Sequence, residues 1–416
     1  MCGIAGIFDL QQQREPDREL LAAMNQTQFH RGPDEGGLHT EPGVGLAHRR
    51  LSIIDLASGQ QPMFSADGNL CVSYNGEIYN FKELMQELRS LGYEFRTHCD
   101  TEVILYAWQA WGEACVQRFR GMFAFGLYDR AARSLFLARD RFGIKPLFYS
   151  ILADGQLIFG SELKVLKAHP QLPRQLDPRA VEDYFALGYV PEPKTIYRDV
   201  YKLCPGHTLL VRQGEPVPQQ RQYWDIPFSP VAVADERDLQ AELQARLREA
   251  VQVRLVSEVP LGAFLSGGVD SSAVVAMMAD LQSEPVNTCA IGFDVKQFNE
   301  TEYAGMVAER YRTNHFQETV SSEDFGLLDE LATLYDEPYA DSSAIPTYRV
   351  CQLARRRVTV ALSGDGGDEH FAGYRRYRWH MHEERLRQAL PLGLRRPLFG
   401  ALGRLYPKAD WAPRIF

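Results

Sequence analysis

The chain lacks the features that mark membrane, secreted and nucleic-acid-binding proteins. None of its apolar runs is long enough to cross a bilayer, and no signal peptide precedes the first apolar segment, Gly3–Phe8. The seven cysteines are scattered, odd in number and without a CxxC pair, so neither a disulfide framework nor a zinc site is indicated. The formal net charge of -9 argues against nucleic acid as a partner, because a phosphate-binding surface normally carries a basic excess. We therefore expect a cytoplasmic protein that binds neither membrane nor nucleic acid.

A length of 416 residues exceeds what one hydrophobic core usually supports, so two domains are expected. In residues 2–210 short strands outnumber helices and do not alternate strictly with them, which favours packed sheets covered by helical layers. Asn80 and Asp100 occupy positions where helix N-caps are expected. The predicted strands are Gly3–Phe8, Val44–His48, Leu70–Tyr74, Phe123–Tyr128, Leu135–Arg139, Leu147–Ser150 and Leu157–Gly160, and the predicted helices are Glu19–Gln28, Phe81–Leu91 and Thr101–Trp111.

The pattern changes after a polar stretch over residues 211–235 that is rich in Pro and Gln and is typical of a linker. In residues 236–416 strands alternate with helices, which predicts a parallel α/β sheet. The predicted helices are Arg237–Val256, one beginning at Ser271, Glu302–Tyr311 and Phe325–Leu334, and the predicted strands are Leu261–Leu265, Val286–Phe293 and Val358–Leu362.

The first candidate for chemistry is Cys2, which follows Met1 directly. If Met1 is removed, Cys2 carries a free α-amine beside its thiol. An α-amine titrates at about pH 7.7–8.0 and can take the thiol proton without help from a histidine. The alternative to a catalytic role is that Cys2 is simply a small thiol near a chain end.

Three further polar segments strengthen the catalytic interpretation of Cys2. Arg50 ends an apolar strand, Asn75-Gly76 follows another predicted strand, and Asp100 precedes a helix. An Asn side-chain amide and a Gly N–H can form an oxyanion hole, and Gly lets the backbone approach a reacting carbonyl closely. Taken singly, Asn75-Gly76 could be a hairpin turn, Arg50 a surface ion pair and Asp100 a helix cap.

Together these runs resemble the class II glutamine amidotransferase domain, a member of the N-terminal nucleophile hydrolases with an αββα sandwich of the α+β class. The resemblance covers residues 1 to about 210. It implies that Cys2 attacks the glutamine side-chain amide, that Asn75 and Gly76 hold the oxyanion, and that Arg50 binds the substrate carboxylate. The remaining glutamine-binding residues that it implies are Leu51, Ser52, Ile53, Ile54, Glu77 and Asp100.

The second candidate site consists of two glycine-rich loops, each after a predicted strand. Residues 265–272 read Leu-Ser-Gly-Gly-Val-Asp-Ser-Ser, and residues 362–369 read Leu-Ser-Gly-Asp-Gly-Gly-Asp-Glu. Adjacent glycines at a strand-to-helix turn present N–H groups to an anion, and carboxylates among glycines suit Mg²⁺. The first loop is not a Walker loop, because it lacks Gly-Lys-Ser/Thr. Both loops should meet at the carboxyl ends of parallel strands, where such sheets bind ligands.

The first loop resembles that of the PP-loop ATP pyrophosphatases. With the second loop and the upstream domain, the whole chain resembles glutamine-hydrolysing asparagine synthetase. That resemblance implies Mg-ATP as cofactor, a pyrophosphate site over residues 266–271, Asp270 and Asp368 as Mg²⁺ ligands, and Asp365 near an acyl-adenylate. The residues implied for ATP binding are Leu265, Ser266, Gly267, Gly268, Asp270, Ser271, Ile291, Ser363 and Gly364.

The implied reaction joins two half-reactions. The second domain adenylates a carboxylate, aspartate in the typical member, and ammonia released at Cys2 displaces AMP to give asparagine. Sealing both sites from solvent protects the adenylate from hydrolysis. A homodimer is implied by the resemblance alone.

The chain departs from the typical pattern in two ways. Many asparagine synthetases carry Glu where this chain has Asp365, a variant that resembles a subgroup associated with exopolysaccharide and exosortase clusters. Family members also continue past the position of Phe416, so we expect the second domain to be C-terminally incomplete. Two alternatives therefore stay open: an amidotransferase acting on another carboxylate in cell-surface biosynthesis, and a fragment limited to glutaminase activity or nucleotide binding. The related β-lactam synthetases are disfavoured, because they usually lack the nucleophilic cysteine.

Overall fold

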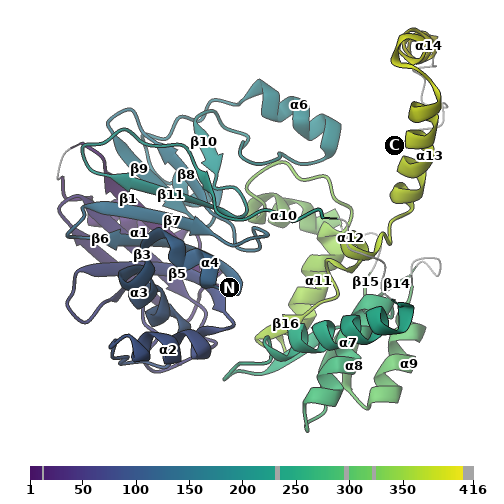
Figure 1. The fold of residues 1–416 in the computed structure, drawn as a ribbon, viewed down its shortest axis with the longest axis horizontal. Coiled ribbons are helices and arrows are strands. Elements are labelled where there is room, and N and C mark those ends of the chain that lie inside the picture. Colours follow the sequence, from purple (N-terminus) through teal and green to yellow (C-terminus); the bar gives the residue numbers. More distant parts are fainter. Residues whose placement is uncertain (12–13, 230–234, 295–298, 321–324, 406–416) are drawn as a thin grey trace.

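The computed structural model describes residues 1–11, 14–229, 235–294, 299–320 and 325–405. Two six-stranded antiparallel sheets form the first part of the chain, and Figure 1 shows them in purple to teal. One has the order β10-β8-β9-β1-β3-β2 and the other β12-β11-β7-β6-β5-β4. Their strands are β1 (Gly3–Asp9), β2 (Glu35–Glu41), β3 (Val44–Arg50), β4 (Met63–Phe64), β5 (Leu70–Ile78), β6 (Gly121–Asp129), β7 (Ser134–Arg139), β8 (Phe148–Ile151), β9 (Gln156–Gly160), β10 (Val200–Lys202), β11 (His207–Arg212) and β12 (Arg221–Gln222).

Helices cover the outer face of each sheet, and three apolar clusters hold the four layers together. One cluster lies between the two sheets, a second packs α2, α3 and α4 on β5, β6 and β7, and a third packs α1, α5 and α6 on the other sheet. The predicted αββα sandwich is therefore confirmed. These helices are α1 (Arg18–Gln26), α2 (Phe81–Ser90), α3 (Asp100–Trp111), α4 (Cys115–Arg118), α5 (Leu163–Lys167) and α6 (Pro178–Leu187), with a 3-10 turn η1 (Gly112–Ala114).

The second part is built on a four-stranded sheet of order β15-β14-β13-β16, and all of its strand pairs are parallel as predicted. Helices α7, α8 and α9 pack on one face of this sheet, and α11 packs on the other. The strands are β13 (Leu261–Phe264), β14 (Asn287–Phe293), β15 (Asn314–Val320) and β16 (Val360–Leu362); the helices are α7 (Glu236–Gln252), α8 (Val269–Leu281), α9 (Thr301–Tyr311), α10 (Leu328–Leu334), α11 (Ala344–Arg355), α12 (Gly367–Phe371), α13 (Arg375–Ala389) and α14 (Leu392–Leu405), with a 3-10 turn η3 (Phe325–Leu327) before α10.

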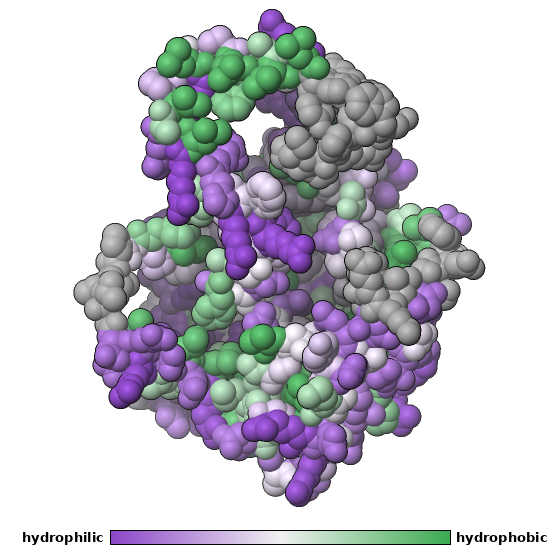
Figure 2. All heavy atoms as spheres, turned by 90° about the vertical axis from the view of Figure 1, so that its right-hand side faces the viewer, coloured by the Kyte–Doolittle hydropathy of each residue, from purple (hydrophilic) through white to green (hydrophobic). Residues whose placement is uncertain are grey.

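The last two helices project away from the sheet, in yellow in Figure 1, and neither has a buried residue. Figure 2 shows apolar side chains gathered at the top of the molecule, over α14. They include Leu394, Leu398 and Leu402, each at least half exposed. None of the described helices is long and apolar enough to cross a lipid bilayer.

Three contacts join the second part to the first beside β5 and the loop after β3. The carboxylate of Glu258 accepts hydrogen bonds from the N–H groups of Asp55 and Leu56, at 3.0 and 3.4 Å. Its own N–H donates to Ile53 O at 3.0 Å. Arg254 lies over the ring of Tyr79, 4.6 Å from its centroid. The segment that leads into β13 is therefore tied directly to the first domain.

The seven strands and three helices predicted in the first part are all present, with shifted ends. One local alternative and one local prediction are wrong. Asn75-Gly76 is not a turn, because β5 continues through Ile78 and pairs with β6 along its whole length. Asp100 is the first residue of α3 and not its N-cap, which is Cys99.

In the second part, the helix predicted from Ser271 begins two residues earlier, at Val269. Strand β15 and helix α11 were not predicted. β15 alternates poorly and leaves most of its residues half or fully exposed, so its sequence carries little strand periodicity.

Replacing Phe159 tests the packing between the two large sheets. Its ring is fully buried, and a Cβ built on Gly6 of β1 or Gly126 of β6 would lie 2.2 or 2.6 Å from it. Phe159→Ala should lower the free energy of unfolding by about 3–5 kcal/mol in urea denaturation, because the ring leaves a cavity. Phe228→Ala, at a side chain that is 89% exposed, is the matched control and should change it by less than about 0.5 kcal/mol. Equal effects of the two substitutions would contradict this packing.

Candidate active site

Cys2 lies directly before a strand that is paired with neighbours on both sides. It directly precedes β1, which pairs with β3 on one side and β9 on the other and is buried along its whole length. The Cys2 thiol donates to Leu51 O at 3.6 Å, and the N–H of Leu51 donates to the sulfur at 3.4 Å. The sulfur is thereby fixed against the first residue after β3.

Burial raises the pKa of the Cys2 thiol above its usual value, whereas the backbone of Leu51 and the charges of the N-terminus and Lys145 lower it. Lys145 is itself buried, which lowers the pKa of its ammonium group, and its Nζ lies 3.1 Å from Met1 Sδ. Burial also lowers the pKa of the Met1 α-amine, to about 5, so this amine is uncharged at neutral pH. An uncharged amine and a lysine of lowered pKa are groups that can accept a thiol proton.

Strand β5 carries a buried amide that has no hydrogen-bond partner within the described residues. Asn75 is buried, and its Nδ2 donates to no atom of the described residues. A buried N–H without a partner is costly, and such groups concentrate where a ligand completes them. The next residue must be glycine, because a Cβ on Gly76 would lie 2.2 Å from Met122 O. An amide donor and a close main chain can together stabilise an oxyanion.

Two carboxylates complete this region. Asp100 accepts hydrogen bonds from Tyr74 Oη at 2.7 Å and from the N–H of Ile78 at 2.9 Å, so α3 is anchored on β5. Burial raises the pKa of the Asp100 carboxyl. Burial, followed by the charge of Asp100, also raises the pKa of Glu77, while the charge of Lys145 lowers it. Charge interactions therefore link Cys2, Lys145, Glu77 and Asp100 into one electrostatic unit.

Arg50 is buried, so the alternative of a surface ion pair is wrong. Its guanidinium donates to Asp55 O at 2.6 Å, to Ile54 O at 3.3 Å and to Leu56 O at 3.4 Å, and pairs with Glu35 at 3.1 Å. The loop after β3, which contains the predicted residues Leu51, Ser52, Ile53 and Ile54, thus folds around the guanidinium. The N–H of Ser52 donates to Asp34 at 2.8 Å.

Sequence reasoning missed Arg31 and Lys145. Arg31 donates from Nε to the main-chain oxygen of Cys2 at 2.9 Å and from Nη1 to Glu162 at 2.9 Å. Its Nη2 is buried and has no partner among the described residues. Neither residue lies within a predicted motif strong enough to identify it, since a lone cation in a loop is usually solvated.

The second candidate site lies at the carboxyl ends of β13 and β16, which run parallel in adjacent positions. Ser266 Oγ and Ser271 Oγ are 2.9 Å apart, and Ser266 Oγ accepts the N–H of Gly268 at 3.2 Å. Gly267 has a φ of +86°, a conformation that favours glycine. Leu265 donates its N–H to Cys289 O at 2.9 Å, which places this loop beside β14.

The two glycine-rich loops touch as predicted. A Cβ on Gly364 would lie 2.7 Å from the N atom of Ser271, and one on Gly367 would lie 2.4 Å from Oδ2 of Asp270. Larger residues at these positions would therefore separate the loops. The carboxylate of Asp270 therefore lies against Gly367, the residue that precedes Asp368 in the sequence.

The remaining predicted residues of this site lie at the same edge of the sheet. Asp365 accepts a hydrogen bond from Ser363 Oγ at 2.9 Å, and both Asp365 and Asp368 are exposed. Ile291 lies two residues beyond Cys289 on β14 and is partly buried. Over the described ranges, no group of three or more His, Cys, Asp and Glu side chains is arranged to hold a metal ion.

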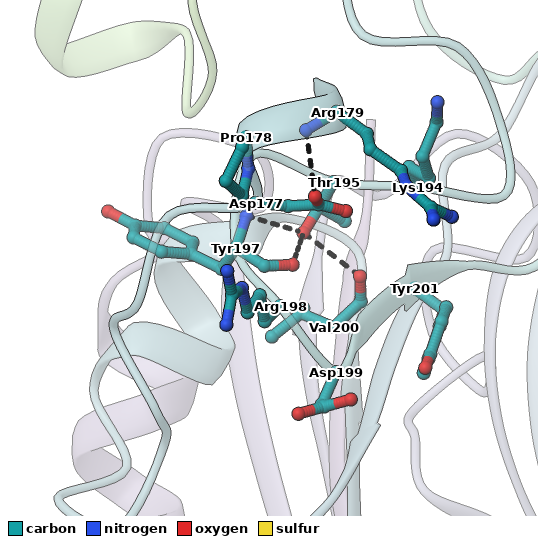
Figure 3. Close-up of a pocket in the computed structure, with 10 residues that line it drawn as sticks. All are labelled: Asp177, Pro178, Arg179, Lys194, Thr195, Tyr197, Arg198, Asp199, Val200 and Tyr201. Carbon is teal, nitrogen blue, oxygen red and sulfur yellow. Dashed lines mark hydrogen bonds between the residues drawn. The ribbon is translucent and has the colours of Figure 1, made fainter. Parts of the chain in front are cut away.

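Neither of two well-formed hollows contains Cys2 or the glycine-rich loops. One, of about 380 Å³, lies between the start of α6 and residues 194–201. Figure 3 shows Thr195 among the residues that line it, with Oγ1 donating to Val200 O at 3.0 Å. The other, of about 560 Å³, lies between α2 and residues 256–258 and reaches Ile54.

Comparison with known proteins matches two separate parts of the chain to two families. Residues 1–224 match the family model described as a glutamine amidotransferase domain, and residues 242–414 match the model described as asparagine synthase. The putative asparagine synthetase (glutamine-hydrolyzing) 2 of Methanocaldococcus jannaschii is 39% identical over 399 residues, covering 90% of this chain and 76% of that protein. Asparagine synthetase (glutamine-hydrolyzing) 1 of Bacillus subtilis is 37% identical, covering 96% and 62%.

A putative asparagine synthetase (glutamine-hydrolyzing) of Mycobacterium bovis is 38% identical, covering 86% of this chain and 57% of that protein. The chain thus spans between 57% and 76% of the length of these curated relatives.

The electrostatic unit around Cys2 predicts an effect of Lys145 on the thiol. The Lys145 charge lowers the pKa of Cys2, so Lys145→Met should move the pH midpoint of Cys2 alkylation upward by about one unit. The measurement is the rate of iodoacetamide labelling of the N-terminal peptide by mass spectrometry between pH 6 and 10. Lys82→Met, at an exposed lysine of α2, is the control and should leave the midpoint unchanged. A midpoint that stays in place in Lys145→Met would refute the assignment.

Proposed function

We propose that this chain, which belongs to the family of glutamine-hydrolysing asparagine synthetases, releases ammonia from glutamine at Cys2 and transfers it to an activated carboxylate. The observation that carries the proposal is the unpartnered Nδ2 of buried Asn75, in a domain whose first strand starts directly after the partly buried Cys2. A thiol adds to an amide carbonyl, and an unpaired donor can take the oxygen charge that develops.

In the proposed first half-reaction, removal of Met1 leaves the α-amine on Cys2 itself, where it accepts the thiol proton. Cys2 attacks the glutamine side-chain amide, ammonia leaves, and water hydrolyses the thioester to glutamate. Asn75 and Gly76 stabilise the oxyanion. Glu77 and Asp100 hold the substrate ammonium, a role that suits two carboxylates in a low-dielectric region.

Arg50 is proposed to bind the α-carboxylate of glutamine with the main chain of residues 51–54. Its guanidinium already contacts three main-chain oxygens of the adjacent loop. A carboxylate would replace neutral acceptors with a charged one, and hydrogen bonds to a charged acceptor are roughly twice as strong.

In the proposed second half-reaction, the domain of residues 236–416 adenylates the carboxylate, most simply that of aspartate, and ammonia displaces AMP to give asparagine. Residues 2–210 form the glutaminase domain, and residues 211–235 join the two. Asp365 is proposed to act near the acyl-adenylate.

The residues present fit Mg-ATP. Gly267 and Gly268 form the turn that leads into α8, Gly267 with a φ of +86°, and Gly364 and Gly367 leave no room for a side chain beside Asp270. ATP would supply the adenylyl group and Mg²⁺ would neutralise phosphate charge. Residues 266–271 would hold the phosphates, and Leu265, Ile291, Ser363 and Gly364 the adenosine. Asp270 and Asp368 would hold Mg²⁺, which commonly takes one or two carboxylates together with phosphate oxygens.

Pyrophosphate release from Mg-ATP, measured with glutamine across a panel of carboxylates, tests the whole reaction. We expect release with aspartate, together with asparagine and AMP in equal amounts. Cys2→Ala should lose glutamine-dependent synthesis and retain synthesis from ammonia, because only the first half-reaction uses the thiol. Intact-mass measurement establishes in the same preparation that Met1 has been removed.

Other outcomes of that panel separate the alternatives. Release with a different carboxylate would show that the chain aminates another acceptor, the alternative favoured by Asp365 in place of Glu. Glutamine hydrolysis without pyrophosphate release from any member would contradict a synthetase activity of this chain.

Asn75→Ala isolates the oxyanion contribution. Removing one oxyanion donor should lower kcat for glutamine hydrolysis by about 10²–10³ and change KM for glutamine little, because the contact strengthens in the transition state. Glutamate production with saturating glutamine gives kcat. Ammonia-dependent synthesis should stay at the wild-type level and serves as the internal control. A variant with normal kcat would remove Asn75 from the oxyanion hole.

A further inference from the structure

A chain of ion pairs runs from the main chain of Cys2 to the second domain. Arg31 donates to the main-chain oxygen of Cys2 at 2.9 Å and to Glu162 at 2.9 Å. Lys164 contacts Glu162 at 2.9 Å on one side and Asp336 at 3.5 Å on the other. Asp336 lies in the connection between α10 and α11 of the second domain.

These side chains are shielded from solvent, unlike most ion pairs of this molecule. The exposed fractions of Arg31, Glu162, Lys164 and Asp336 are 8%, 13%, 17% and 10%. Water therefore screens the interactions little, and the loss of one partner leaves an uncompensated charge. The geometry of each link depends on its neighbours.

Glu162 is the centre of this series of ion pairs, because an arginine, a lysine and a histidine side chain converge on it. His30 Nε2 lies 3.0 Å away, and Arg31 and Lys164 each lie 2.9 Å away. Burial opposes ionisation of Glu162, but the hydrogen bonds from His30 and Arg31 and the charge of Arg31 prevail and lower its pKa to about 2. Glu162 is thus ionised at any working pH.

The series of ion pairs ends in the second domain, where two adjacent carboxylates, those of Asp336 and Glu337, contact the first domain. Asp336 also accepts the N–H of Lys164 at 3.0 Å, and Lys164 Nζ donates to Leu334 O at 2.9 Å. The neighbouring Glu337 accepts from Lys202 Nζ at 2.6 Å and from the N–H of Ile196 at 2.7 Å. Both carboxylates dock on the first domain, but of the two only Asp336 is linked to Cys2 by the ion pairs that the described residues form.

We propose that Asp336 is a positioning residue of the glutamine site, through which the second domain fixes the main chain of the nucleophile by way of Lys164, Glu162 and Arg31. This inference rests on the proposed reaction at Cys2. The second domain therefore acts on the first half-reaction as well as on the second. A small displacement of a reacting group costs rate steeply, which is why a distant anchor can matter.

Asp336→Asn tests the proposal with little change of shape, because the amide oxygen can still accept the N–H of Lys164. In the full chain, kcat for glutamine hydrolysis should fall about tenfold, since the misplaced nucleophile attacks less often. The restraint on the thiol is also released, so iodoacetamide labelling of Cys2 should become faster by at least about twofold. Asp336→Glu, which restores the charge, should recover part of kcat.

Glu337→Gln is the matched control. It removes an equally buried interdomain carboxylate from the next residue of the same connection, and it should leave both kcat and the labelling rate at wild-type values. General loosening of the domain contact would instead affect the two variants alike, which would overturn the proposal. Wild-type behaviour of Asp336→Asn in both measurements would overturn it equally.

Two further features keep the test decisive. If Asp336→Asn does not fold, Lys164→Gln breaks the same chain one link closer to Cys2, and the comparison with Glu337→Gln applies to it unchanged. The rate of iodoacetamide labelling of Cys2 can be measured whether or not glutamine is a substrate. Absence of glutamate from the wild-type protein would refute the proposed function, whereas equal labelling of Cys2 in the wild type and Asp336→Asn would refute the positioning role alone.

Discussion

The glutaminase half of this molecule depends on the burial of β1 in the middle of a six-stranded sheet. Terminal residues of a chain usually fray, but β1 is hydrogen-bonded along both edges, to β3 and to β9, and all of its side chains are buried. The position of Cys2 is therefore fixed by β1, although Cys2 is only the second residue. Burial also raises the pKa of the thiol, so the site needs an acceptor for its proton and cations nearby, and Lys145 is one such cation.

The two candidate sites are built in opposite ways. Around Cys2 the groups already hold one another, because Leu51 and Arg31 both bond to Cys2. At the carboxyl ends of β13 and β16 the groups are loops of glycine and serine with exposed carboxylates.

The domains contact each other at points that matter to both sites. Glu258, just before β13, binds the loop that folds around Arg50, so the strand that ends in the first glycine-rich loop begins beside that loop of the first domain. Asp336 reaches Cys2 from another direction, through Lys164. Ion pairs buried between domains are sensitive to geometry because their desolvation is offset only by good contacts. Such contacts provide a physical route by which the state of one site can influence the other.

Much of this arrangement follows from the sequence. Apolar alternation located the strands of the first domain, and the change to alternating strands and helices after residue 235 predicted the parallel sheet and the meeting of its two glycine-rich loops. These features are local, because periodicity and turn residues act over short stretches of chain. Asn75-Gly76 shows the limit of that reasoning, since the pair resembles a turn and becomes a strand only through its register with β6. Arg31, Lys145, Glu162 and Asp336 acquire their roles solely from burial and from partners far along the chain, and that is why only the tertiary structure could identify them.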